Sequence, residues 1–564
     1  MKYNVLYKTL EFLRIHARQA KLPEIIACSS ICDYLKNNEL LKERLSTSLK
    51  EDLSHLIENN HSFAQLKEHL ADMESILFIP ETDLFYKKLK EEAFIAKDLE
   101  TEDQDILEIA NNKLISRIEG FEFLSKKAFT PTVTSWLTEG KKDLNVYCPF
   151  NNLLDLEKEL SSENKVLVAT NNSYTLLAKK IYLSSKGLDS VSLLTLSPKH
   201  LEEVQNKFDV AFSFPPLAMR LEKTPDTLEM KLIEELLEKV SGRFCVVTIV
   251  GLSNTSSPRY IDFREKILKT CKLQSVVELP GGFVPFSGVC CLAWFFDCGK
   301  ENKDIISFID LSRAECKDQK NSGRTQFEFN DYAIKNLING LNHKDDDLVK
   351  NVSLNEIKDN GYILTPSRYV LSKKAQEARS KVLQGDTKLS KVVEILRTQV
   401  IRTLDEGNTY YEVSASDINP MGVVENPSKT ILQTEDNVAT KNLLKKDDII
   451  FAIKGSVGKV GLITEDHDNW LLNQSFVILR VKNKNWPVEF VFRQLKSNNM
   501  KVYLQGQTIG SVIPSLAVSD LKEIPLVSPT KENIEEQKEK HVRQLELTKM
   551  LHKITAELDE LNVF

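Results

Sequence analysis

Apolar residues in the first part of the chain recur at helical spacing on a charged background. Segments 3–20, 39–59 and 63–79 follow this pattern and contain few runs of β-branched residues. Residues three and four apart share one face of an α-helix, so this periodicity is typical of helices that bury one side. The pattern therefore predicts a helical N-terminal domain over residues 1–130.

From residue 145 the pattern changes to short apolar runs separated by amphipathic stretches. The runs fall at 165–169, 191–196, 208–212, 244–250 and 273–279. Continuous apolar runs that alternate with helices are typical of parallel strands buried on both faces. Residues 131–370 are therefore predicted to form a doubly wound α/β sheet, a fold that binds ligands beyond the carboxyl ends of its strands.

The remaining third of the chain divides at a polar stretch. We expect a linker helix at 371–386, and then a mixed α/β domain at 387–530 that is rich in strands and has turn residues at Lys454, Gly455 and Gly458. Residues 531–564 are predicted to form a charged helix. The fold class is therefore a multidomain α/β protein with helical segments at both ends.

The predicted C-terminal helix carries an apolar seam with intervals of four and three residues. Its members are Leu547, Leu551, Ile554, Leu558 and Leu561. This spacing is a heptad pattern, although it is short for a free coiled coil. We weigh two partners equally: the same helix of a second copy, which would make a homodimer, and the linker helix of the chain itself around 371–382.

Composition adds bounds on the class of protein. The 564 residues are 41% hydrophobic and 28% charged, which is ordinary for a globular protein of several domains. No apolar stretch is long enough for a membrane helix and the start lacks a signal peptide, so we expect a cytoplasmic protein. The nine cysteines include no Cys-x-x-Cys spacing, which favours buried thiols over a metal site.

The net charge of −6 indicates no strongly basic nucleic-acid binder, so any such surface must be local. One cluster, at 441–461, holds five lysines against two aspartates. Another, at 480–501, holds six basic residues against one glutamate. Solvated charge is an equally good explanation for either cluster alone.

Two sets of motifs carry a family resemblance over about 145–562. The first runs Val276-Val-Glu-Leu-Pro280-Gly-Gly-Phe283, Ser287-Gly-Val289 and Gly361-Tyr-Ile-Leu-Thr-Pro-Ser-Arg-Tyr369. In order and spacing it resembles the methyltransferase domain of type I restriction-modification modification subunits. The second runs Leu444-Lys-Lys-Asp-Asp-Ile-Ile-Phe451, the glycine-punctuated basic loop 454–461, Asn473-Gln474 and Ile524-Pro-Leu526, and it resembles a specificity subunit's target-recognition domain.

This resemblance implies a DNA-binding surface. Glycines let a loop approach DNA closely, lysines neutralise phosphates, and amide or hydroxyl side chains can contact bases. The residues expected to bind double-stranded DNA are Lys454, Ser456, Lys459, Gln474, Gln507 and Ser511.

The methyltransferase-like part departs from the family at its functional positions. A glycine-rich turn should hold S-adenosylmethionine after the first strand, but the stretch compared with it, Ala169-Thr-Asn171-Asn-Ser173, has no glycine. Thr195 stands where a carboxylate should bind the ribose. The catalytic turn should run Asn or Asp, Pro, Pro, aromatic residue, and here it is Phe214-Pro215-Pro216-Leu217. A phenyl ring offers no acceptor for the target amino group.

We therefore expect a DNA-recognition component of a restriction-modification or phage-defence system, with no catalytic residues, cofactor or metal. Nuclease or motor subunits would be separate chains, since no Gly-x-x-x-x-Gly-Lys-Ser/Thr loop is present. One alternative is an active adenine methyltransferase that uses S-adenosylmethionine, with Ser213 in place of the missing acceptor. A second is an interaction scaffold that no longer binds DNA.

Overall fold

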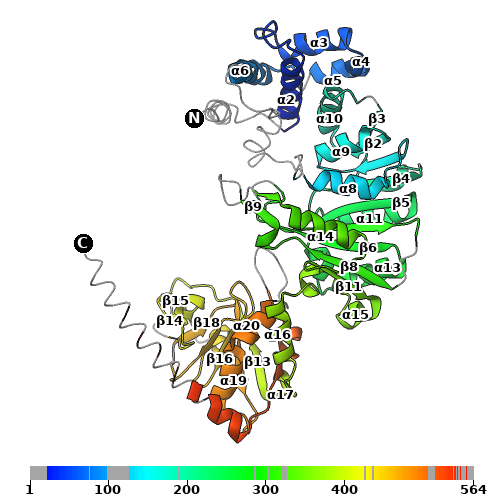
Figure 1. Ribbon diagram of the computed structural model, residues 1–564. Coiled ribbons are helices and arrows are strands. Elements are labelled where there is room, and N and C mark those ends of the chain that lie inside the picture. Colours follow the sequence, from blue (N-terminus) through cyan, green and yellow to red (C-terminus); the bar gives the residue numbers. More distant parts are fainter. Residues whose placement is uncertain are drawn as a thin grey trace. The chain divides into compact units, whose positions relative to one another are not determined.

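A computed structural model describes residues 22–540 apart from 75–76, 98–125, 127, 189, 223, 225, 285–286, 301–303, 320–326, 425–426, 435–436, 506–514 and 538, and four positions beyond (543, 547, 550 and 554). The chain forms two compact units, Met1–Val370 and Leu371–Phe564 (Figure 1). The domain bounds inside these units stay predictions. The predicted helix at 3–20 lies outside the described residues.

Short helices form the N-terminal part of the first unit. They are α2 (Leu22–Asn37), α3 (Leu49–Asn59), α4 (His61–Ala64), η1 (Gln65–His69), α5 (Leu70–Glu74) and α6 (Pro80–Lys97). Their apolar faces share one core, which also includes Leu177 and Ile181 of α10 (Ser173–Ser185). Inside it, the buried Asp52 accepts hydrogen bonds from Lys90 at 2.7 Å and Tyr86 at 2.8 Å. The helical character predicted for this part is confirmed where the structure describes it, although residues 39–48 of the predicted segment 39–59 form turns and the helix begins at Leu49.

A nine-stranded sheet forms the rest of the first unit, in the order β11-β8-β6-β7-β5-β4-β1-β2-β3. The strands are β1 (Asn145–Pro149), β2 (Lys165–Thr170), β3 (Val191–Thr195), β4 (Phe208–Ser213), β5 (Val240–Ile249), β6 (Leu273–Leu279), β7 (Cys291–Asp297), β8 (Ile305–Asp310) and β11 (Val349–Ser353). Neighbours pair in parallel except where β7 or β11 takes part.

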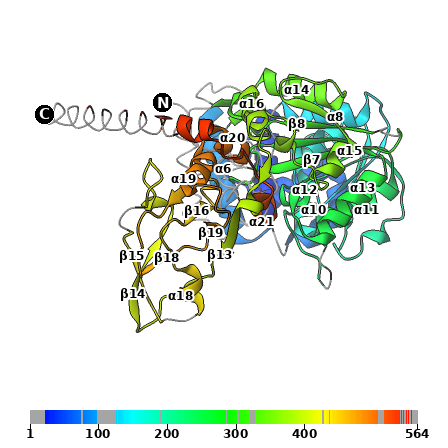
Figure 2. The same ribbon diagram turned by 90° about the horizontal axis from the view of Figure 1, so that it is seen from below.

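Helices cover both faces of this sheet. On one face α8 (Phe129–Thr138), α9 (Leu154–Ser161), α10 and α14 (Asp331–Leu341) share a core with side chains such as Val168 and Val247. On the other, α11 (Leu228–Lys239) and α13 (Pro258–Lys269) pack against side chains such as Val246 and Trp294. Figure 2 shows α8 and α14 on one side and α11 and α13 on the other. The predicted doubly wound fold is confirmed.

Smaller elements complete the first unit. They are η3 (Leu201–Glu203), α12 (Gly251–Asn254), η4 (Ala314–Cys316), β9 (Lys317–Gln319), β10 (Phe327–Phe329), α15 (Leu354–Asp359) and η5 (Pro366–Arg368). The five predicted strands appear as β2 to β6, but β1 was not predicted. This strand stands between β2 and β4, where the order of the strands along the chain reverses.

The second unit is built on two small sheets. A four-stranded antiparallel sheet has the order β13 (Val393–Arg397), β19 (Phe476–Val481), β16 (Ile449–Ala452) and β17 (Val460–Leu462). A three-stranded sheet has the order β15 (Lys429–Gln433), β14 (Asn408–Val413) and β18 (Trp470–Leu472). The pair β12 (Thr387–Lys388) and β20 (Pro525–Leu526) joins the two ends of the unit.

Helices cover one face of the four-stranded sheet, while the three-stranded sheet covers the other. The helices of this unit are α16 (Lys373–Val382), α17 (Leu389–Val392), η6 (Ala415–Asp417), α18 (Asn437–Asn442), α19 (Val488–Lys496), α20 (Asn498–Gln505) and α21 (Val518–Lys522). The predicted linker helix, α16, packs against α20 and buries Ala378 and Val382. The expected mixed α/β character is confirmed.

Little of the C-terminal seam is described. Leu547 and Ile554 are about half exposed, and Leu551, Leu558 and Leu561 lie outside the described residues. No helix in the described part of the chain is both long and apolar enough to cross a membrane.

Candidate nucleic-acid interface and the end of the nine-stranded sheet

The loop between β16 and β17 carries the basic residues expected to bind DNA. Gly455 and Gly458 both have left-handed backbone, with φ values of +71° and +77°. A Cβ at Gly458 would also lie 3.0 Å from Cδ1 of Leu504 in α20, whereas one at Gly455 would meet nothing within 4 Å. Glycine therefore lets this loop turn tightly against α20 and leaves its outer side open.

The turn between β18 and β19 lies against this loop. The carbonyl of Ser475 accepts the backbone N–H of Ile453 at 2.8 Å and that of Lys454 at 3.1 Å. Asn473 stabilises the turn, because its Oδ1 accepts the N–H of Ser475 at 2.9 Å. The exposed Gln474 is thereby held beside Lys454.

Four of the six predicted DNA-binding residues are described, and they differ in exposure. Lys454, Ser456 and Gln474 are exposed and lie on adjoining turns. Lys459 is only partly exposed, and its ammonium group donates a hydrogen bond to the carbonyl of Ala415. The first three are thus open to a ligand, while Lys459 ties the loop to the neighbouring sheet.

Gln507 and Ser511, the other two predicted residues, lie outside the described residues. The described chain resumes at Ser515, which forms a β-bridge with Lys454. Next to it, the N–H of Leu516 donates to the carbonyl of Ile453 at 2.9 Å. Segment 515–516 therefore belongs to the same surface as the basic loop.

The basic cluster at 480–501 does not act as one patch. Arg480 makes two hydrogen bonds of 2.8 Å to the buried carboxylate of Asp448, and Lys482 donates to the carbonyl of Ser390 at 2.8 Å. These groups are committed to the fold of the second unit. Lys484 lies between β19 and α19. The remaining three cations lie on α19 and α20, at a different place.

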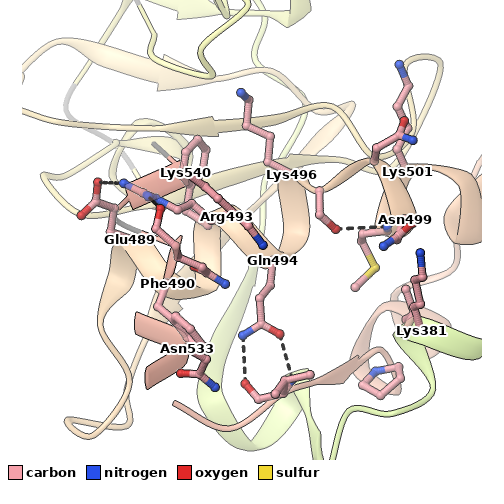
Figure 3. Close-up of a pocket in the computed structure, with 18 of the residues that line it drawn as sticks. Lys381, Glu489, Phe490, Arg493, Gln494, Lys496, Asn499, Lys501, Asn533 and Lys540 are labelled. Carbon is pink, nitrogen blue, oxygen red and sulfur yellow. Dashed lines mark hydrogen bonds and ion pairs between the residues drawn. The ribbon is translucent and has the colours of Figure 1, made fainter. Parts of the chain in front are cut away.

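A hollow of about 680 Å³ lies where α16, α19, α20 and the segment 533–540 meet (Figure 3). Its basic lining residues are Lys381, Arg493, Lys496, Lys501 and Lys540. Glu489 also lines it and accepts a hydrogen bond from Arg493 at 2.6 Å. Sequence analysis missed this hollow, because Lys381 and Lys540 are far in the sequence from the other three cations.

In the first unit, the strand ends beyond which such sheets bind ligands are hydrogen-bonded to one another. The strand order reverses at β1 and β4, and a ligand would bind beyond their carboxyl ends. There the hydroxyl of Ser213 donates to the carbonyl of Pro149 at 2.6 Å, and the N–H of Asn152 donates to the carbonyl of Phe214 at 3.1 Å. The two strand ends are thus bonded directly to one another.

Phe150 follows β1 and takes the place that a glycine turn would need. Its backbone is left-handed, with φ +49°, and its N–H donates to the carbonyl of Ala169 at 2.6 Å. The side chain is 2% exposed and lies in the core under α11 and α13. Phe150 therefore has a backbone conformation that usually favours glycine, and its ring occupies space in the core that a glycine would leave empty.

A buried ion pair supports the segment after β1. The ammonium of Lys179 lies 2.7 Å from Oε1 of Glu157 and also donates to the carbonyl of Asn151. The side-chain amide of Asn151 donates to the same Glu157 oxygen at 3.0 Å. Burial raises the pKa of Glu157, while the ammonium of Lys179 lowers it in part. These contacts lock segment 150–153 in place.

The degenerate catalytic turn serves as core. Phe214 is fully buried, and its ring lies 6.2 Å from that of Phe283 in a stacked arrangement. Pro215 is buried as well, while Pro216 and Leu217 are partly exposed. The ring of Phe214 therefore points into the protein. Ser213, the proposed substitute acceptor, is fully buried and bonded to Pro149.

The positions compared with cofactor ligands stand one strand further along the sheet. Ala169, Asn171 and Ser173 belong to the end of β2 and the start of α10, and Thr195 ends β3. The sequence pattern predicts β2 as the first strand of the sheet, whereas in the structure β1 precedes it. The correct segment to compare, 145–153, also lacks glycine, and β2 ends in Thr170 without a carboxylate.

Two family models match the chain in succession. The N-6 DNA methylase model matches residues 198–378, and the type I restriction modification DNA specificity domain model matches residues 386–561. No curated protein matches the chain.

Several solved structures are similar at low identity. The methyltransferase subunit of a type I restriction-modification system from Streptococcus thermophilus is 14% identical, with 66% of this chain and 99% of that chain covered and a TM-score of 0.46. The type IIG restriction endonuclease BpuSI is 10% identical, with 92% and 72% covered and a TM-score of 0.42. A type I system S subunit from M. genitalium is 22% identical, with 31% and 43% covered and a TM-score of 0.22. Because these scores are low, the structural likenesses carry no argument about function.

Proposed function

The chain joins an N-6 DNA methylase region to a type I restriction modification DNA specificity domain, and we propose that it recognises DNA without methylating it. In this proposal the second unit binds the duplex. The first unit is a methyltransferase-like scaffold that has lost cofactor binding and catalysis. The protein would serve a restriction-modification or phage-defence system in the cytoplasm.

The closed end of the nine-stranded sheet carries this proposal. S-adenosylmethionine needs close backbone approach after the strand at the switch point, β1, and an acceptor for its ribose hydroxyls. Phe150 is buried there with its ring in the core, and β2 ends in Thr170. These residues do not fit the cofactor. Phe214, facing the core, provides no acceptor for a target amino group either.

The exposed side chains of the second unit fit a duplex. The ammonium of Lys454 would neutralise a phosphate, and its contact releases a counterion. The amide of Gln474 has both a donor and an acceptor, which suits the base edges of the major groove. The hydroxyl of Ser456 would bond to the backbone of the DNA. Sequence preference would then rest on Gln474 more than on Lys454.

The two alternatives make different demands on the structure. An active methyltransferase would require Ser213 to leave its bond to Pro149 and segment 150–153 to open. A scaffold that does not bind DNA would leave the exposed loop as a solvated surface. Nuclease or motor subunits would be separate chains both for an active methyltransferase and for the proposed recognition component.

Titration calorimetry with S-adenosylmethionine tests the loss of the cofactor site. We expect no saturable heat in the micromolar range. A dissociation constant below about ten micromolar, which is roughly 7 kcal/mol of binding, would contradict the proposal and favour the active enzyme. In parallel, a shift assay on duplex DNA at several salt concentrations should show binding that weakens as salt rises. No shift at low salt would favour the scaffold.

A homodimer through the C-terminal helix remains part of the proposal. One recognition domain suits one half-site, and a two-fold dimer pairs two half-sites. Leu547 and Ile554 are exposed in the single chain, and the buried face of α16 packs against α20. Light scattering should give a dimer that becomes a folded monomer in the Leu551→Glu, Leu558→Glu variant. An intact protein that is monomeric with and without DNA contradicts the dimer.

A further inference from the structure

The basic hollow of the second unit is not used by the proposed function. We propose that it binds a small oligophosphate anion. The site is the hollow described above, between α16, α19, α20 and segment 533–540, and the ligand class is a short chain of phosphates, either inorganic or carried by an organic group.

Uncompensated positive charge is the first argument. Five basic side chains line the hollow against one carboxylate, Glu489, which already accepts from Arg493. Lys540 pairs with Glu536 at 2.5 Å. In the described part of the chain, the ammonium groups of Lys381, Lys496 and Lys501 have no hydrogen-bond or ion-pair partner. Several like charges that line one hollow without partners favour a ligand with more than one negative charge.

Lys496 supplies the second argument. It is only partly exposed, and both burial and the neighbouring guanidinium of Arg493 lower its pKa. A half-buried cation beside another cation is unfavourable unless an anion joins them. Figure 3 shows Lys496, Lys501 and Lys381 placed around the hollow. A phosphate between these groups would remove the repulsion and supply acceptors for several donors.

The form of the hollow favours a compact ligand. A volume of about 680 Å³ is in the range of small-molecule sites, and the lining combines amide donors at Gln494, Asn499 and Asn533 with apolar groups such as Met421 and Val527. The side-chain amide of Gln494 is already paired with the backbone of Val527 at 2.8 and 2.9 Å, so it stiffens the wall. Asn533 is paired as well, because its amide nitrogen donates to the carbonyl of Ser528 at 2.8 Å and its Oδ1 accepts the N–H of Thr530 at 2.6 Å. Asn499 remains a candidate to orient an anion.

The hollow is also separate from the recognition loop. Residues 497–501, at the beginning of α20, line the hollow. The basic loop lies near the other end of this helix, where a Cβ at Gly458 would lie 3.0 Å from Cδ1 of Leu504. A small ligand in the hollow would therefore leave Lys454, Ser456 and Gln474 exposed. The proposal does not depend on DNA recognition, and each can fail without the other.

Titration calorimetry on the full chain at low salt tests the site, with inorganic tripolyphosphate and adenosine 5′-triphosphate as probes. We expect saturable binding that weakens about tenfold or more in the Lys496→Gln, Lys501→Gln variant. The matched control, Lys484→Gln with Lys522→Gln, replaces two exposed lysines outside the hollow and should bind within about twofold of the parent. Circular dichroism checks that both variants fold, and Lys501→Gln alone replaces the double variant if it does not.

Four outcomes decide the proposal. Binding of both probes that is lost in the hollow variant and kept in the control supports it, and tighter binding of the nucleotide shows that the apolar wall holds an organic group. Absence of saturable binding by either probe overturns it. It is equally overturned if the control loses affinity as much as the hollow variant, or if the hollow variant weakens only duplex DNA binding, since the hollow would then be part of the DNA surface.

Discussion

The end of the nine-stranded sheet and the loops of the second unit are the two places where the family resemblance predicts function, and they are built in opposite ways. At the first, Asn151, Ser213 and Phe214 are buried, and their polar groups bond to other parts of the protein. At the second, Lys454 and Gln474 are exposed and have no side-chain partner among the described residues. Buried and satisfied groups serve the fold, whereas exposed donors are available to a ligand.

Under the proposed function, this difference means that a doubly wound sheet can keep its core without its site. The strands of the first unit need only apolar side chains on both faces, and these are present from β1 to β8. A cofactor site needs in addition a cavity at the switch point, which costs packing. Filling that place with Phe150 and Phe214 adds buried apolar area, so stability and cofactor binding favour different residues there.

The largest expected effect is on the ion pair that locks segment 150–153. Lys179→Met leaves the carboxylate of Glu157 buried without its partner, and we expect a loss of about 3–5 kcal/mol in the free energy of unfolding. The pKa of Glu157 is already raised by burial and would rise further without the ammonium. A carboxyl group whose pKa is raised in the folded state favours folding at pH values below its unfolded pKa, and this contribution is lost as pH rises through the folded pKa. The loss of stability in the variant should therefore grow with pH.

Urea unfolding of the full chain at pH 5.5 and pH 7.5 measures this effect. Lys158→Met on α9, the helix of Glu157, is the matched control, because its side chain is exposed, and its effect should stay within about 0.5 kcal/mol. Equal stability of the Lys179 variant and the control would mean that the segment after β1 is loosely held. The contrast between the two regions would then fail.

Sequence periodicity predicted most of the first unit's sheet but missed β1, the strand at the switch point. The predicted strands are rich in valine and leucine, whereas β1 reads Asn-Val-Tyr-Cys-Pro and gives no continuous apolar run. Its burial comes from its neighbours β2 and β4, which no local pattern reports. As a result, the positions compared with cofactor ligands were one strand too far along, although the absence of glycine holds for both segments.

Exposure of the basic loop was predictable, but the individual role of each lysine was not. The glycines and the polar turn residues predict an open loop around Lys454, and the structure has one. Lys459 looked equivalent in the sequence, yet its partner, the carbonyl of Ala415, lies 44 residues away. The hollow has the same origin, because its cations come together only through the packing of α16 on α20.

A smaller effect is expected at Glu278, at the same end of the nine-stranded sheet. Burial and the nearby carboxylate of Asp310 raise its pKa to about 7. The folded state therefore holds this proton at pH 6, and stability is lost as pH rises through about 7. We expect the parent to lose about 1 kcal/mol between pH 6 and pH 8 relative to Glu278→Gln, which does not titrate.

Thermal and urea unfolding of the two proteins at both pH values gives this difference. Glu159→Gln, an exposed glutamate on α9, is the control and should keep the pH dependence of the parent. Parallel curves for the parent and Glu278→Gln would show that this carboxyl group is not buried as described.

The smallest expected effects separate the two lysines of the basic loop. Lys454→Ala removes an exposed cation, so duplex binding should weaken roughly threefold for every sequence, and the slope of log affinity against log salt should flatten by about 0.9. Lys459→Ala removes a bond to Ala415 instead. It should lower stability by about 1 kcal/mol and leave the salt slope unchanged.

Shift assays between low and physiological salt measure the slopes, with Lys484→Ala as an exposed lysine outside the loop for comparison. Because each phosphate contact contributes nearly one unit, the assay counts contacts and is insensitive to a general change in fold. A flattened slope for Lys459→Ala would mean that its bond to Ala415 opens when DNA binds, and the loop would then contribute two contacts. An unchanged slope for Lys454→Ala would place the DNA surface elsewhere, and the exposed loop would be no more a functional site than the closed end of the sheet.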